Sequence, residues 1–414
     1  MKRFLILLLA VLCLSFSGCG NREGGPTPTP EIAVNTDGAV PQENLMFVPA
    51  DVGKNYFADT QGDGLYCANN GVLSYYDIES GSSAILCPQT GCGHNSEICP
   101  AYLNGAQNMA IYQGNVYTVT EATDERALKV VRCSLGQTDQ VELCQIPASE
   151  GTYIHLGSAR ISHENIFLTA VERDEENQNR YCLWSINAET GAVSKLVSGN
   201  SGEYISFYGA SSNMAAVECQ TYTGLMPREN DYKNYEDYIA AWDAFEKAQG
   251  LLELRLYDLN SGTYTVLADS KADGYLQPID FRMCLDDLLL YRLENSLWTY
   301  DLSTVEKTLQ LTQANLVNYM FLDGKILTIT QDESGLCGCY LAELDGEPIP
   351  LTSAMTEGRM RFSAAYETPQ YFVGIFAGNS GYYKISKADF YAGCYENVTL
   401  VSKWDLGIKN GTSV

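Results

Sequence analysis

Short runs in which hydrophobic and polar residues alternate recur along most of the chain, and each run ends in a turn sequence. The clearest copy spans residues 257–267, where two alternating segments flank Asn260-Ser261-Gly262. Alternation places the apolar side chains on one face of a half-buried strand, and Ser-Gly supplies the residue of positive φ that a tight turn needs. The pattern therefore predicts a series of β-hairpins.

The hairpin phrase is repeated seven times. Each copy has an aromatic or polar residue, then Asp or a similar polar residue, an aliphatic residue, a turn and a closing strand. The copies span residues 76–86, 133–143, 184–196, 257–267, 300–311, 341–351 and 383–401, of which the last is stretched by an insertion. Further strand pairs precede some copies, as at 111–117 and 321–327.

Two hairpins per unit give four antiparallel strands, which is the content of a propeller blade. We therefore predict an all-β fold, a β-propeller of seven four-stranded blades over residues 45–405. The degenerate copies leave six or eight blades open. A set of unrelated hairpins in a β-sandwich or in two β-domains is the alternative.

Residues 229–249 interrupt this rhythm and predict a helical insertion. Tyr232, Tyr235, Trp242 and Phe245 fall at three- and four-residue steps, which puts them on one helical face. The aromatic stripe either packs on the propeller's own surface or forms a partner-binding patch, since Tyr and Trp suit both sugar stacking and protein contact.

The N-terminal segment, residues 1–18, has the order of an export signal. A basic head is followed by an apolar run and by Ser17-Gly18-Cys19. The cysteine directly after Ser-Gly resembles the signal of bacterial lipoproteins. This resemblance implies cleavage before Cys19 and a diacylglycerol on its thiol. An ordinary signal peptide before a coincidental cysteine is the alternative, and the apolar run is shorter than the roughly 20 residues that span a bilayer.

Residues 19–44 are rich in Pro, Thr and Gly and contain few large hydrophobic residues. Such a stretch favours an extended, disordered tether. Together with the lipid on Cys19 it indicates a protein anchored to the cell membrane on its extracytoplasmic face. Residues 406–414 form a C-terminal tail.

The charge of the chain excludes one class of partner. Its formal net charge is −25, which would repel a phosphate backbone, so we expect no nucleic-acid binding. The same charge opposes electrostatic attachment to anionic lipid. We therefore expect the membrane contact to be made through the lipid on Cys19.

One cluster carries a specific chemical signal. Cys87, Cys92, His94 and Cys99 lie within thirteen residues, and three thiolates with one imidazole form a complete tetrahedral set for structural zinc. A disulfide from Cys99 to Cys87 or to Cys92 is the alternative, since exported chains meet oxidising surroundings. Four protein ligands leave no open position, so a catalytic metal is not expected.

Two resemblances bear on these predictions. The string from Cys87 to Tyr102 resembles one in lipoproteins of anaerobic gut Firmicutes, of the form Cys-Pro-x-x-x-Cys-x-His-x-x-x-x-Cys-x-Ala-Tyr and of unassigned role. In an anaerobe thiols can remain reduced outside the cell, which favours metal.

The hairpin phrase resembles that of YncE-like, TolB-like and YVTN-type propellers, a class that implies the fold and no single function.

The sequence gives little support to catalysis. It contains three histidines, and it lacks a Gly-x-Ser-x-Gly elbow, a phosphate-binding loop of the Gly-x-x-x-x-Gly-Lys type and a His-Glu-x-x-His zinc helix. We therefore expect a non-catalytic propeller that binds a glycan, a peptide or an envelope protein. The alternative is a polysaccharide lyase or hydrolase that uses the central channel.

Overall fold

The computed structural model describes most of the chain between residues 45 and 403. The described residues are 45–46, 48–49, 55–59, 62–69, 71–96, 98–103, 106, 108–122, 124–176, 178–200, 202–224, 226–271, 284–293, 295–332, 337–351, 362–376, 381–392 and 394–403. All of them belong to one compact unit, 34–414. The predicted signal segment, Cys19, the tether and the C-terminal tail lie outside the described residues.

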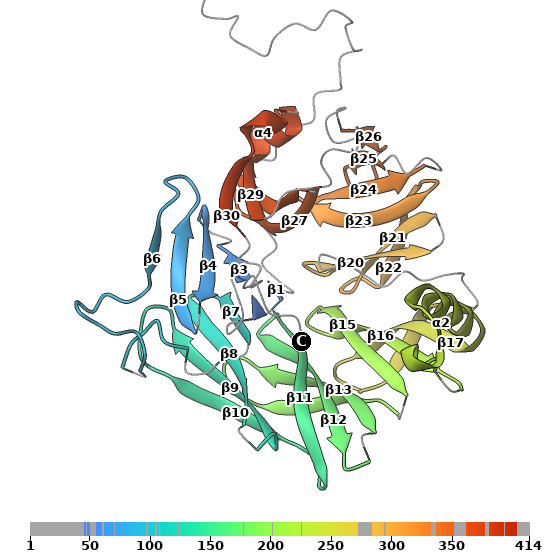
Figure 1. Ribbon diagram of the computed structural model, residues 1–414, viewed down its shortest axis with the longest axis horizontal. Coiled ribbons are helices and arrows are strands. Elements are labelled where there is room, and N and C mark those ends of the chain that lie inside the picture. Colours follow the sequence, from blue (N-terminus) through green and yellow to red (C-terminus); the bar gives the residue numbers. More distant parts are fainter. Residues whose placement is uncertain are drawn as a thin grey trace, which may run out of the picture. The chain divides into compact units, whose positions relative to one another are not determined.

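Seven antiparallel sheets follow one another along the chain and form a seven-bladed propeller, as predicted (Figure 1). Blade 1 consists of β3 (Asn55–Ala58), β4 (Gly64–Asn69), β5 (Val72–Asp77) and β6 (Ser83–Ile85). Blade 2 consists of β7 (Asn108–Tyr112), β8 (Asn115–Glu121), β9 (Ala127–Ser134) and β10 (Val141–Pro147). Blade 3 consists of β11 (Thr152–Ser162), β12 (Asn165–Asp174), β13 (Asn179–Asn187) and β14 (Val193–Ser198).

The remaining four blades have the same order of strands. They consist of β15 (Glu203–Ala210), β16 (Met214–Tyr222), β17 (Gly250–Asp258) and β18 (Tyr264–Asp269); β19 (Cys284–Leu285), β20 (Leu288–Leu293), β21 (Ser296–Asp301) and β22 (Glu306–Thr312); β23 (Leu316–Leu322), β24 (Lys325–Gln331), β25 (Cys337–Ala342) and β26 (Ile349–Pro350); and β27 (Phe362–Glu367), β28 (Tyr371–Phe376), β29 (Gly381–Ser386) and β30 (Thr399–Lys403).

The repeated phrase forms the outer hairpin of every blade, between its third and fourth strands. Its polar residue closes the turn: the Asp77 carboxylate accepts the Ser80 backbone N–H at 2.7 Å, and Asp258 accepts that of Ser261 at 2.9 Å. Gly262 then takes a φ of +69°, which a residue with a side chain rarely adopts. Local turn chemistry therefore stabilises the hairpins that the sequence pattern predicted.

Burial falls from the inner to the outer strands. In β8 four consecutive residues are buried, whereas all three residues of β6 are exposed. The inner strands are covered on both faces by the neighbouring blades, so they are hydrophobic on both faces.

The segment before the first blade extends two other blades. β1 (Leu45–Met46) pairs with β11, and β2 (Val48–Pro49) pairs with β7. Each adds a fifth strand beside the first strand of its blade. Residues 45–46 therefore lie at the inner edge of blade 3, and residues 48–49 at that of blade 2.

Blade 7 closes against blade 1 through turn residues. Asp63 of blade 1 accepts hydrogen bonds from the Thr368 hydroxyl at 3.0 Å and from the Gln370 backbone N–H at 2.9 Å. Lys384 of blade 7 also donates to the Ile78 carbonyl of blade 1. These contacts join residues more than 300 positions apart in the sequence.

Helices are few. The predicted insertion in blade 4 contains η1 (Glu229–Asp231) and α2 (Tyr235–Gln249), and blade 7 contains α4 (Lys387–Ala392) and η2 (Tyr395–Asn397) between β29 and β30. The sequence pattern indicated an insertion in this last phrase but not a helix. Among the described residues no helix is long and apolar enough to cross a membrane.

Candidate metal centre

The four predicted metal ligands lie in the connection between blades 1 and 2, after β6 and before β7. The chain must turn sharply there because two ligands, Cys92 and His94, are separated by one residue. Gly91 has a φ of +73° and His94 a φ of +53°. Glycine adopts this region freely, and histidine is among the few other residues that enter it.

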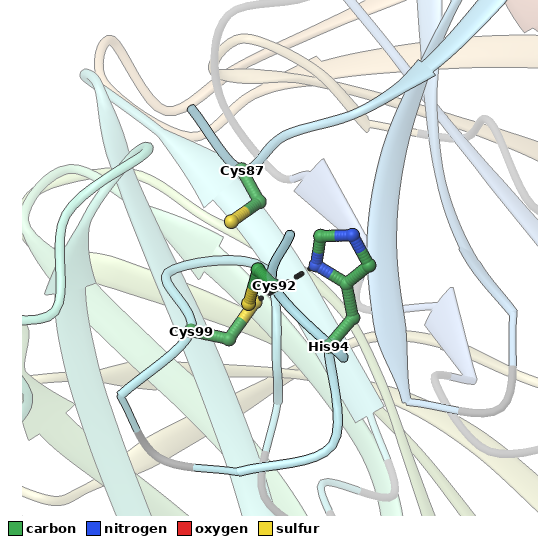
Figure 2. Close-up of side chains that lie close together, drawn as sticks. All are labelled: Cys87, Cys92, His94 and Cys99. Atoms are coloured by element: carbon green, nitrogen blue, oxygen red, sulfur yellow. Dashed lines mark hydrogen bonds between the residues drawn. The ribbon is translucent and has the colours of Figure 1, made fainter. Parts of the chain in front are cut away.

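The side chains of Cys87, Cys92, His94 and Cys99 converge (Figure 2). One donor atom from each lies within 4.8 Å of all the others, and Nδ1 of His94 is 3.3 Å from Sγ of Cys99. A tetrahedral zinc site with bonds of about 2.0–2.3 Å has donor–donor edges of about 3.5–3.8 Å. A movement of about 1 Å in the widest pair would therefore bring the four donors to zinc-binding geometry.

The protonation of the thiols depends on their surroundings. The backbone N–H of His94 donates to Cys92 and lowers the pKa of that thiol, whereas burial raises the pKa of Cys99 to about 11. Cys87, Cys92 and Cys99 are all free thiols in the structure. A metal that binds Cys99 must displace its proton, so metal binding at this cluster should depend on pH.

The donor set fits zinc and favours a structural role. Three sulfurs and one imidazole nitrogen fill the four tetrahedral positions, so a bound ion would have no site left for water or substrate. The sequence therefore predicted which residues come together, and the spacing of cysteines with one histidine was the signal.

Backbone hydrogen bonds to blade 1 hold the last part of this connection. Leu73 and Leu103 each exchange a backbone hydrogen bond with the opposite segment, Leu73 N–H to Ala101 O and Leu103 N–H to Gly71 O, both at 2.8 Å. Further upstream, the Gln89 side chain donates to the Ile98 carbonyl at 3.1 Å. In the described part of the ligand-bearing segment the backbone forms local turns, Cys92 N–H to Gln89 O at 3.4 Å and Cys99 N–H to Ser96 O at 2.9 Å. A metal would add a cross-link between these turns.

The predicted aromatic stripe on α2 is divided into two parts. Trp242 and Phe245 lie against Tyr222 of blade 4, with ring centroids 5.9 and 5.7 Å away. At the other end Tyr235 is 63 % exposed, and Tyr232 contacts another ring of the insertion, that of Tyr238, at 6.0 Å. One end of the stripe thus packs on the propeller, and the other end faces solvent.

The structure also brings together polar residues that the sequence did not single out. Lys387 donates to Asp323 at 2.6 Å and to Glu367 at 3.0 Å, and all three are at least 96 % buried between blades 6 and 7. In blade 4 the Tyr208 hydroxyl donates to Glu218 at 2.8 Å. Burial raises the pKa of Glu218 to about 7. Asp323 and Glu367 lie 64 and 20 residues before Lys387 in the chain, so no local sequence pattern indicated this ion group.

No protein-family model matches the chain, and no curated protein matches its sequence. Several solved structures contain a similar fold. The acylaminoacyl peptidase of Pyrococcus horikoshii is 11 % identical with a TM-score of 0.47, over 86 % of this chain and 54 % of the peptidase. This chain therefore spans about half the length of that enzyme.

Two further structures match over most of their own length. The β-propeller domain of the Trilobed protease from Pyrococcus furiosus is 11 % identical with a TM-score of 0.43, over 86 % of this chain and 99 % of that domain. An oligogalacturonate lyase from Vibrio parahaemolyticus is 8 % identical with a TM-score of 0.41, over 81 % and 89 %. What these proteins share with this chain is a propeller fold.

Proposed function

We propose that this protein is a non-catalytic binding propeller, anchored by a lipid on Cys19 to the extracytoplasmic face of the cell membrane, in which Cys87, Cys92, His94 and Cys99 hold one structural zinc ion. The observation that carries the zinc assignment is the convergence of four soft or borderline donors within 4.8 Å. A closed donor set stabilises a loop and performs no reaction.

Substitution and elemental analysis test the zinc assignment. Full-length protein purified without added metal should contain about one zinc per chain, and Cys92→Ser should lower that content. Cys144→Ser is the matched control, since Cys144 is a free thiol of β10 outside the cluster. Zinc-free protein with a disulfide between two of these three cysteines would refute the metal and support the disulfide alternative.

The exposed end of the α2 stripe supports a contact with a partner. An aromatic ring that is more than half exposed offers stacking area to a sugar or a protein at low entropic cost. We expect Tyr235→Ala to weaken retention on a panel of cell-wall glycans or envelope proteins. Tyr264→Ala is the control, because that ring is also exposed (48 %) and lies on the outer strand β18.

The lipid anchor is tested separately. Mass spectrometry of the mature N-terminus should find a diacylglyceryl group on Cys19, and Cys19→Ala should release the protein from membranes or leave the signal uncleaved. An unmodified mature N-terminus at any other residue would refute the lipid anchor.

A lyase or hydrolase is the second candidate, and one observation favours it. Tyr208 and Glu218 form a hydrogen-bonded pair in which the carboxyl has a pKa of about 7, a value suited to proton transfer at neutral pH. Both side chains are more than nine-tenths buried, so a substrate would reach them only after a rearrangement. Product formation from polysaccharides that disappears in Glu218→Gln would favour this candidate.

A further inference from the structure

One line of side chains along α2 is largely uncovered by the rest of the described protein. Tyr235, Ile239 and Trp242 follow one another at steps of four and three residues, so their side chains lie along one face of the helix. Tyr235 is 63 % exposed and Ile239 is 39 % exposed. Trp242 is half-buried, because its ring also contacts Tyr222 at 5.9 Å. This seam of three residues therefore runs over two helical turns, from the surface of blade 4 into solvent.

The spacing of the seam is that of a helix-packing surface. Steps of four and three residues repeat every seven, which is the pattern with which one helix packs along another. In that pattern the residues directly after the first and third seam positions flank the contact and select the partner by charge. In α2 these residues are Glu236 and Asp243. Both are exposed, and neither carboxylate has a hydrogen bond or an ion pair with another described side chain.

The charge around the seam favours a cationic partner. Residues 228–249 carry six carboxylates and three cationic side chains, within a chain whose formal charge is −25. Glu236 and Asp243 are seven residues apart, or about 10.5 Å along the helix axis. Two cations seven residues apart on a partner helix have the same separation, so they can meet both carboxylates. A second copy of α2 would bring like charges together, which opposes self-association through this helix.

The tyrosines beside the seam favour a cation over a row of sugar rings. Tyr238 lies 6.0 Å from both Tyr232 and Tyr235, and its ring is tilted by 54° and 45° to theirs. Rings tilted in this way share no flat platform on which successive sugars could stack. A guanidinium or an ammonium group binds over the face of a single ring instead. Such a contact exists elsewhere in the chain, with Arg126 over Tyr153 at 4.4 Å, but no described lysine or arginine lies over these three rings.

We infer that α2 is the docking site for a basic amphipathic helix of a partner protein. Apolar side chains of that helix lie on Ile239 and Trp242. Two of its cations, seven residues apart, lie against Glu236 and Asp243, and the first also covers the ring of Tyr235. The inference rests on the proposed function, because it names the partner of the α2 contact, but it requires neither the zinc ion nor the lipid.

Isothermal titration calorimetry of the full-length protein with designed peptides tests this inference. The probe is an alanine-based helix of about 18 residues, with leucines at its seam positions and two arginines seven residues apart beside them. One control peptide carries glutamates in place of the arginines, and another has the composition of the probe in scrambled order. We expect the probe to bind and both controls to bind at least about tenfold more weakly. Added salt should weaken the binding of the probe, because it screens exposed charges.

Paired variants assign the binding to α2. Glu236→Gln/Asp243→Asn removes two charges beside the seam, keeps its shape and should raise the Kd of the probe about tenfold. Glu306→Gln/Glu347→Gln removes two exposed charges from blades 5 and 6 and should leave the Kd unchanged. Ile239→Ser should also raise the Kd, because it removes apolar contact area from the seam. Circular dichroism of each variant checks its fold.

Three results would overturn the inference. A probe that does not bind would refute the docking of a basic helix. Equal affinities for the probe and the glutamate peptide would refute the role of charge, and equal losses in the two double variants would place the binding outside α2. Glycan retention that Tyr235→Ala weakens, without binding of the probe, would keep the proposed contact and make a sugar its ligand. If neither is observed, the α2 contact itself is refuted.

Discussion

Two blade junctions of this propeller are held by different chemistry. Between blades 6 and 7, Lys387 at the start of α4 donates hydrogen bonds to Asp323 and Glu367. The Tyr391 hydroxyl donates to the other carboxylate oxygen of Asp323 at 2.9 Å. Between blades 1 and 2, a connection whose described residues form turns and no named strand carries three thiols and one imidazole, with a cavity beside it. The first junction satisfies its polar groups within the protein.

The second junction instead holds a donor set that could take up a metal ion. Charges that are paired and buried cost several kcal/mol to remove but offer nothing to a ligand. Thiols and an imidazole, in contrast, offer donors to a metal and leave the neighbouring wall adjustable. The comparison therefore contrasts a junction that is closed by the protein's own ion group with one whose donors could hold a metal.

The largest effect should come from breaking the buried ion group. Lys387→Met leaves Asp323 and Glu367 buried without their cation and should lower the free energy of unfolding by about 3–5 kcal/mol. Chemical denaturation measures this loss, and Lys271→Met, at an exposed position, is the control. A loss below about 1 kcal/mol would mean that the junction does not depend on the ion group.

A buried carboxyl without a basic partner should behave differently. The pKa of Glu218 is raised from 4.5 to about 7, so the folded protein binds its proton more tightly than the unfolded chain does. The stability that this proton provides is complete below about pH 4.5 and is lost as the pH rises to about 7. Its size is about 3 kcal/mol.

Glu218→Gln should remove this dependence. Unfolding free energies of the wild type and the variant, measured between pH 4.5 and 8, should diverge by that amount in favour of the variant at the upper end. Parallel curves would show that the carboxyl is not desolvated in solution.

A smaller, local effect should follow removal of the metal. Chelation should leave the blades folded and increase hydrogen exchange at the amides of residues 98–103 by roughly tenfold, which corresponds to about 1.4 kcal/mol of local opening. Amides of β12, which lie in the middle of blade 3, are the internal reference. Exchange that rises equally in both places would mean that the metal supports the whole fold.

The sequence predicted those features whose cause is local. Seven copies of a hairpin phrase, clearest around Asp77 and Asp258, predicted seven blades with six or eight left open, because a turn is specified by a few adjacent residues. The cluster at Cys87–Cys99 was visible for the same reason. The periodicity of 229–249 predicted α2, although the helix itself begins at Tyr235.

Features that depend on folding were not predictable. Lys387 meets Asp323 only when blades 6 and 7 are side by side. The pairing of residues 48–49 with blade 2 and of residues 45–46 with blade 3 likewise depends on strands that are about 60 and about 115 residues away in the chain. No local composition signals contacts of this range.

The zinc content of the native protein tests the central claim most directly. Native mass spectrometry of full-length protein, purified under reducing conditions without added metal, should show one zinc ion per chain, and this ion should be absent from a Cys87→Ser/Cys99→Ser variant. X-ray absorption at the zinc edge should find three sulfur neighbours and one nitrogen neighbour. Metal-free chains with all three thiols reduced, or zinc retained by the variant, would contradict the account.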